Sequence, residues 1–295
     1  MKKKKNTAIL WAVLAAALYA ISAPFSKILL NEIPPTMMAA LLYLGAGIGM
    51  SIIGLFRYKT GQLKKEMRLT KKEMPFTMGM VLLDIAAPIF LMIGLTMTTP
   101  ATASLLNNFE IVATSLIALF IFKETINKRL WMAIGLITVA SIFLSVEDFS
   151  SISFSFGSLF VLLAAICWGL ENNFTRMLSV KDPLEIVIIK GFGSGLGSLL
   201  ISFIIKETTT NVVYIIATLL LGFVAYGLSI YLYVYAQRYL GAAKTSAYYA
   251  ISPFIGVGLS FIMFLEIPTL SFIIALLIMI VGAYFASTDN HVKKD

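Results

Sequence analysis

The chain has 295 residues, of which 59% are apolar and only 13% are charged, against roughly 25% charged residues in soluble domains. A soluble protein of this length needs more polar surface, so the composition indicates a membrane protein whose exterior faces lipid. The net charge of +8 does not indicate a nucleic-acid-binding protein, because the basic residues lie in short gaps between apolar runs.

Ten apolar segments follow one another, most of them about 20 residues long, which lets a helix cross a hydrocarbon core of roughly 30 Å. They lie near residues 7–30, 36–56, 74–97, 101–122, 130–146, 155–178, 183–205, 212–235, 243–264 and 269–287. The first segment follows a basic stretch, as in a signal peptide. We interpret it as a membrane span, because it is long and Pro24 follows the supposed cleavage site.

The gaps between the segments alternate in charge. Most of the 23 basic residues fall in the N-terminal tail, in the second, fourth, sixth and eighth gaps, and after the last segment. The other gaps contain a single basic residue, Lys206. By the positive-inside rule both termini are expected in the cytoplasm, which agrees with an even number of spans.

The second half of the chain repeats the first. The aligned stretches are residues 10–29 with 159–178 and residues 101–145 with 243–287. Lys27 meets Arg176 in the first alignment, and Glu124 meets Glu266 in the second.

This repeat predicts two units of five spans each, residues 1–148 and 149–295. Because five is odd, the two units must face opposite ways across the membrane. The expected fold is therefore all-α, with ten transmembrane helices arranged as two inverted five-helix repeats. Inverted repeats are typical of alternating-access transporters.

Two aligned stretches carry a family resemblance. TPATASLLNNFEIVATSLIALFIFKE and GAAKTSAYYAISPFIGVGLSFIMFLE each combine small residues, an apolar run and a closing glutamate. They are similar to EamA-type ten-helix members of the drug/metabolite transporter superfamily. The family often has a Glu-Pro step where the first copy has Glu110-Ile111, whereas the second copy keeps Ser252-Pro253. The missing proline leaves open whether the first of these helices is kinked.

The resemblance implies five-plus-five inverted repeats around a central cavity in the plasma membrane. It also implies transport of small solutes such as amino acids, amines, bases or drugs. It does not select one substrate.

Ionisable residues at membrane depth are costly, so each is a candidate for substrate binding, gating or proton coupling. These residues are Asp84, Glu110, Glu171 and Lys190. Asp84 lies near the middle of the third span, one turn before Pro88. It can bind a cation or a proton, or it can be a neutral carboxyl that is hydrogen-bonded between helices.

Glu110 belongs to a polar stripe whose members are three or four residues apart. The stripe contains Ala103, Asn107, Glu110 and Thr114, and its counterpart contains Lys244, Thr245, Tyr249, Ser252 and Gly256. Two related stripes favour a shared binding cavity. The alternative is that these polar groups only hold neighbouring helices together.

Glu171 shares a helix face with Trp168 and Thr175, and the first span repeats this order as Tyr19, Ser22 and Ser26. The rings of Tyr19 and Trp168 suit a cationic substrate, or they are ordinary packing aromatics.

Lys190 lies at a similar depth to Glu171, which predicts an ion pair that acts as a gate or as a static brace. The brace is favoured, because a buried pair must be complete to be tolerated. We expect Lys27 to extend to the outer interface. Tyr226 aligns with Asp84 and is expected at the same cavity. Glu124 and Glu266 are interpreted as structural.

The predicted function is secondary transport of a small metabolite, an organic cation or a zwitterion, with the proton as a candidate coupling ion. Proton coupling requires a carboxyl whose pKa is raised, which burial can supply. The alternative is export of neutral or zwitterionic metabolites such as amino acids or nucleobases. The predicted substrate-binding residues are Tyr19, Ser22, Asp84, Asn107, Glu110, Trp168, Glu171, Tyr226, Tyr249 and Ser252. The predicted gate or proton-coupling residues are Asp84, Glu110, Glu171 and Lys190.

Other functional classes are disfavoured. The single histidine, His291, and the single cysteine, Cys167, leave zinc sites and Ser-His-Asp catalysis without their residues. We therefore expect no enzyme, no metal and no cofactor. A channel is disfavoured because rings of repeated charge are absent from the sequence, and an adaptor has no need of acidic groups at membrane depth. The expected partners are a small-molecule substrate, protons and membrane lipid, without nucleic acid.

Overall fold

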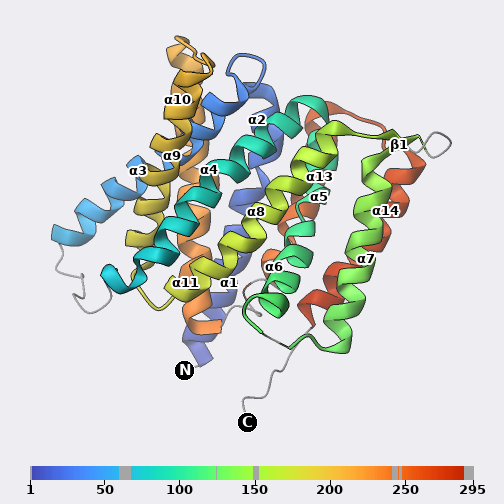
Figure 1. The fold of residues 1–295 in the computed structure, drawn as a ribbon, viewed down its shortest axis with the longest axis horizontal. Coiled ribbons are helices and arrows are strands. Elements are labelled where there is room, and N and C mark those ends of the chain that lie inside the picture. Colours follow the sequence, from blue (N-terminus) through green and yellow to red (C-terminus); the bar gives the residue numbers. More distant parts are fainter. Residues whose placement is uncertain are drawn as a thin grey trace.

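The computed structural model describes residues 2–59, 68–123, 125–148, 153–240, 245 and 248–288. This part of the chain is almost entirely helical (Figure 1), which confirms the expected class. The helices of the first half are α1 (Lys2–Ala20), α2 (Ser22–Leu29), α3 (Pro35–Lys59), α4 (Met74–Met97), α5 (Pro100–Leu106), α6 (Phe109–Phe120) and α7 (Lys128–Ser145). A short 3-10 helix, η2 (Lys71–Glu73), precedes α4.

A small antiparallel pair of strands, β1 (Val146–Asp148) and β2 (Ser153–Phe154), links the two halves. The helices of the second half are α8 (Phe156–Leu178), α9 (Pro183–Ile204), α10 (Val212–Leu221), α11 (Ser229–Leu240), α13 (Ser252–Phe264) and α14 (Leu270–Ser287). A π-helical turn, η3 (Gly222–Leu228), joins α10 to α11.

Nine helical stretches of the described residues are long and apolar enough to cross a membrane. The tenth expected span, near 243–264, is represented by the 13 residues of α13. Residues 241–244, 246 and 247 lie outside the described part, and Lys244 of the predicted polar stripe is among them.

Several spans are interrupted near the middle of the bundle. Turns at Asn107 and Asn108 separate α5 from α6, so this span is broken although it lacks the Glu-Pro step. In the second copy α13 begins at Ser252, with Pro253 in its first turn, where a missing N–H costs nothing. The two breaks bring polar residues to the ends of helices rather than to their sides.

The two halves are extensively interlocked. α3 packs on α9, α4 on α8, α5 on α13, α7 on α14, and α1 on α11. Each of these pairs joins a helix of the first half to one of the second. Figure 1 shows α3, α9 and α10 at one end of the bundle and α7 with α14 at the other.

Glycines allow the closest of these contacts. A Cβ atom on Gly191 would lie 2.4 Å from the Cα of Gly47, and one on Gly222 would lie 2.0 Å from the carbonyl oxygen of Leu42. Small residues let helix backbones approach in this way in membrane proteins. α3 is therefore held tightly between α9 and η3.

The end of α3, the starts of α4 and α7, the α8–α9 turn and the end of α11 lie at the lower face in Figure 1. In the sequence these segments or the residues next to them carry basic side chains, and we call this the basic face, defined by Arg57, Arg68, Arg129, Lys181 and Arg238. Arg57 pairs with Asp182 at 3.0 Å, and Arg238 donates to the carbonyl oxygen of Lys181 at 2.6 Å.

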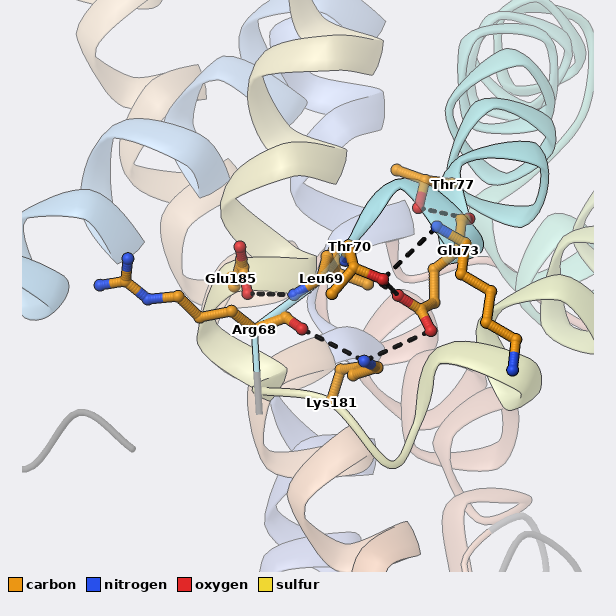
Figure 2. A network of polar contacts seen from close by, with 8 residues as sticks. Arg68, Leu69, Thr70, Glu73, Thr77, Lys181 and Glu185 are labelled. Carbon is orange, nitrogen blue, oxygen red and sulfur yellow. Dashed lines mark hydrogen bonds and ion pairs between the residues drawn. The ribbon is translucent and has the colours of Figure 1, made fainter. Parts of the chain in front are cut away.

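Figure 2 shows the rest of this network between the segment before α4 and the α8–α9 turn. Lys181 pairs with Glu73 at 3.3 Å and donates to the carbonyl oxygen of Arg68, while the Leu69 N–H donates to Glu185. These contacts hold the α3–α4 side of the bundle against the α8–α9 side.

Candidate functional site

A cavity of about 350 Å³, here the large cavity, lies among α6, α8 and α11 and the ends of α7 and α14. Its lining contains Tyr19, Asn107, Asn108, Glu110, Ile111, Thr114, Ser115, Ala118, Thr125, Ile126, Leu130, Asn172, Asn173, Arg176, Tyr233, Gln237, Tyr249, Ala250, Ser252, Pro253, Ala286 and Ser287. Glu110 lies at its inner part, whereas Ile126, Leu130 and Ser287 lie at the basic face. The large cavity thus runs from the middle of the bundle toward that face.

Glu110 is the acidic group of the large cavity. The break between α5 and α6 puts it in the first turn of α6, and the side-chain amide of Asn172 donates to its carboxylate. The predicted stripe is largely brought together here, since Asn107, Glu110 and Thr114 all line the large cavity. Ala103 does not, because it is fully buried against other helices.

Several polar atoms of this lining lack a hydrogen-bond partner within the described protein although they are buried. They are Asn107 Oδ1, Asn108 Nδ2, Gln237 Oε1 and Ser252 Oγ. Buried polar groups are costly unless they are hydrogen-bonded. Such a lining suits a polar solute that supplies the missing partners.

The predicted aromatic residues form one cluster although they come from distant parts of the chain. The ring centroid of Tyr19 lies 6.4 Å from that of Trp168, 5.6 Å from that of Tyr226 and 6.0 Å from that of Tyr249. Ser22 donates to the Tyr226 hydroxyl at 3.2 Å. The cluster forms the inner wall of the site.

Lys190 lies between two buried carboxylates, and we call Asp84, Glu171 and Lys190 the charge cluster. The Lys190 Nζ lies 2.9 Å from Glu171 Oε1 and 3.1 Å from Asp84 Oδ2. The structure therefore contains the predicted Glu171–Lys190 pair and adds Asp84 as a third member.

The charge cluster is sealed on most sides. Asp84 is 0% exposed, Glu171 is 2% exposed and Lys190 is 4% exposed. The hydroxyl of Tyr43 donates to Asp84 Oδ1 at 2.9 Å, and the hydroxyl of Thr175 donates to Glu171. Asp84 lines neither the large cavity nor the smaller one described next, so it lies behind the site rather than in its wall.

A small cavity of about 70 Å³ connects the two acidic regions. Its lining includes Glu110, Glu171, Lys190, Tyr43, Trp168 and Tyr226. Glu110 belongs to both cavities, so the large cavity and the charge cluster are adjacent along α8.

Sequence reasoning missed Tyr43, Asn172 and Tyr233. Tyr43 lies in an otherwise apolar stretch of α3, where a tyrosine reads as packing, and only its contact with Asp84 reveals its role. Asn172 follows Glu171 directly, and a second polar residue beside a buried glutamate is a signal that could have been used.

The structure shows which groups accept from Lys27, whereas its extension to the outer interface stays a prediction. Its ammonium group donates to the carbonyl oxygens of Leu95 at 2.6 Å and Thr98 at 2.9 Å. The open end of α4 supplies acceptors at that point, and they satisfy the charge within the chain.

The glutamates that close the two aligned stretches are Glu124 and Glu266. Glu124 lies outside the described residues. Glu266 lies between α13 and α14, where partial burial raises the pKa of its carboxyl and the charge of Lys27 opposes that rise. Glu266 is not part of the lining of either cavity.

Within the described residues no group of three or more His, Cys, Asp or Glu side chains is placed to hold a metal ion. The described lining of the large cavity offers the carboxylate of Glu110, the guanidinium of Arg176, a set of amides and hydroxyls, and tyrosine rings. These groups suit reversible binding of a small polar solute.

A bundle of apolar helices around a polar cavity defines a multi-pass membrane transporter. The chain belongs to the EamA-like transporter family, whose model matches residues 6–146 and 155–288. The two matches cover the two halves and agree with the drug/metabolite transporter superfamily, and the plasma membrane fits such a protein. They point to a transporter rather than an enzyme.

Two further proteins are similar to this chain. One is described as an uncharacterized transporter of Methanothermobacter thermautotrophicus and is 28% identical over 288 residues, which cover 92% of this chain and 83% of that protein. The other is a crystal structure with a TM-score of 0.69 and 17% identity, covering 95% of this chain and 96% of the other. The second likeness shows the fold alone.

Proposed function

We propose that the protein is a secondary active transporter that moves an organic cation or a zwitterion, such as an amine or amino acid, by alternating access. The observation that carries this proposal is Glu110, a carboxylate at the inner end of a polar cavity, beside the rings of Tyr19 and Tyr249. A carboxylate with aromatic faces is suited to bind an ammonium group. The proton is the proposed coupling ion.

We further propose that residues 1–148 and 149–295 form inverted repeats with both termini in the cytoplasm. The helix pairing supports this, because α3 packs on its counterpart α9, α5 on α13, and α7 on α14. The α4–α8 contact is likewise mirrored by the α11–α1 contact. On this arrangement the basic face is cytoplasmic, and the large cavity is open inward.

Arg176 favours a zwitterion among these substrates. It lies near the end of α8 and lines the large cavity on the side of the basic face, whereas Glu110 lies deeper. A solute with its carboxylate toward Arg176 and its ammonium group toward Glu110 would place each of its charges near an opposite one. The alternative is export of neutral or zwitterionic metabolites, which the amides of the lining could bind without Glu110.

The test is a thermal-unfolding screen of purified protein in detergent against amines, quaternary ammonium ions, amino acids and nucleobases. A ligand at 100 times its Kd adds about 2.7 kcal/mol to the free energy of unfolding. We expect amines or amino acids to stabilise the wild type and to lose this effect in Glu110→Gln. Glu32→Gln, an exposed acid outside both cavities, is the matched control and should respond like the wild type.

The alternative function predicts a different pattern. If nucleobases or other neutral compounds stabilise the wild type and Glu110→Gln equally, Glu110 does not bind the substrate. That result would replace the cation or zwitterion model by the exporter of neutral metabolites.

A further inference from the structure

We propose that the charge cluster is the site at which the coupling proton is held, separate from the carboxylate that binds substrate. The inference deepens the proposed function and rests on it for the meaning of the proton in transport. Asp84, Glu171 and Lys190 contribute two carboxyls and one ammonium group at a site that is at most 4% exposed. One bound proton makes this group electrically neutral.

The charges that face the cluster can be counted among the described residues. From the neighbouring elements these are Tyr43 of α3, Tyr226 of η3, Thr175 of α8, Tyr233 of α11 and Glu110 of α6, with Tyr19 and Tyr249 beyond them. Among the described residues that line the small cavity, Lys190 is the one with a basic side chain. A second cation that would balance the second carboxylate is therefore not supplied by the lining, and an unbalanced charge at this depth is expensive.

The geometry favours a proton over a metal ion. The Lys190 ammonium contacts both carboxylates, at 2.9 Å and 3.1 Å, and so takes the position between them that a metal ion would need. The remaining oxygen of Asp84 accepts from Tyr43, which further limits the ligands left for a metal. A proton needs no coordination shell and can be held on one carboxyl oxygen.

The small cavity gives this proton a route. Glu171 and Lys190 line it whereas Asp84 does not, so the charge cluster reaches this cavity through those two residues. Glu110 lines the same cavity and receives a hydrogen bond from Asn172, the residue next to Glu171. A cation bound at Glu110 therefore favours release of the proton from the charge cluster, because both positive charges compete for one small volume.

The exchange is balanced in charge. One monovalent cation arrives at Glu110, and one proton leaves the charge cluster, after which Lys190 remains between two carboxylates. The cluster joins α4 of the first half to α8 and α9 of the second, so the change of charge falls on the contact between the halves. This position lets a bound proton influence which conformation is preferred.

Infrared spectroscopy of the purified protein tests the proposal without any substrate. At neutral pH we expect the carbonyl stretch of one protonated carboxylic acid per chain in Glu110→Gln, which lacks the carboxyl that lines the small cavity outside the charge cluster, and the other variants are compared in that background. The band should disappear in Glu171→Gln and in Asp84→Asn, because one remaining carboxylate then balances Lys190. It should double in Lys190→Met.

Two outcomes overturn the proposal. One is a wild-type protein without the band between about pH 6 and 8, which would make the charge cluster a fully ionised brace. The other is a wild-type band that is absent in Glu110→Gln. Circular dichroism and gel filtration of each variant check the fold. Since no substrate is used, this result stands apart from the outcome of the ligand screen.

Discussion

The charge cluster and the large cavity present carboxyl groups in opposite surroundings. Asp84 and Glu171 are packed among α3, α4, α8 and α9 with a lysine between them, whereas Glu110 faces an open cavity and has one amide donor. The first surroundings require charge balance inside the protein. In the second surroundings, the negative charge of Glu110 is left for a ligand to balance. Carboxyls at similar membrane depth can therefore have different functions, and their partners distinguish them.

The largest effect should come from removing the cation of the charge cluster. Lys190→Met leaves two buried carboxyls without a counter-charge, which we expect to cost about 3–5 kcal/mol of the free energy of unfolding at neutral pH. The loss should shrink as pH falls, because holding both carboxyls protonated in the folded protein then costs less free energy. Unfolding by SDS in mixed micelles at several pH values measures this effect.

Lys206→Met is the control for that variant, because Lys206 is an exposed lysine between α9 and α10. It should leave the unfolding midpoint close to that of the wild type. Equal stabilities of the Lys190 and Lys206 variants would show that the charge cluster is not energetically distinct from the surface.

A medium effect is expected where the backbones of α3 and α9 touch. Gly191→Ala would put a methyl group 2.4 Å from the Cα of Gly47, and we expect this overpacking to cost about 1–3 kcal/mol. Gly258→Ala is the matched control, since a Cβ there meets nothing within 4 Å. The same SDS titration compares them, and a Gly191 variant as stable as the control would mean that this contact can open at little cost.

The smallest effect should come from the basic face. Arg57→Gln removes the 3.0 Å pair with Asp182, and we expect a loss of about 1 kcal/mol or less, since partly exposed ion pairs are screened by water. The loss should fall further in high salt. Thermal unfolding at low and high NaCl checks this, and a large, salt-independent loss would place this pair with the charge cluster in importance.

The sequence predicted the helices well because an apolar run of that length has few alternatives to crossing a membrane. It also predicted the Glu171–Lys190 pair, because two opposite charges at the same membrane depth are less costly when they are paired. It did not place Asp84 with them, because the depth of a residue along its own helix does not show which neighbouring helix its side chain contacts.

Other residues were harder to predict for physical reasons. Tyr43 lies in an apolar span and becomes a polar residue only through its bond to Asp84. Lys27 donates to the carbonyl oxygens at the end of α4, which the sequence did not identify as its partners. Both cases depend on contacts between helices, which the pattern of a single helix does not contain.

The glycine contact between α3 and α9 also limits how the molecule can change shape. Two backbones that meet at Gly47 and Gly191 have no side chains between them that could adopt new rotamers. Sliding α9 by one turn would bring either Val187 or Gly195 opposite Gly47, and of these the valine is too large for that narrow place. The contact therefore lets the two helices swivel about it and resists a one-turn slide in one of the two directions.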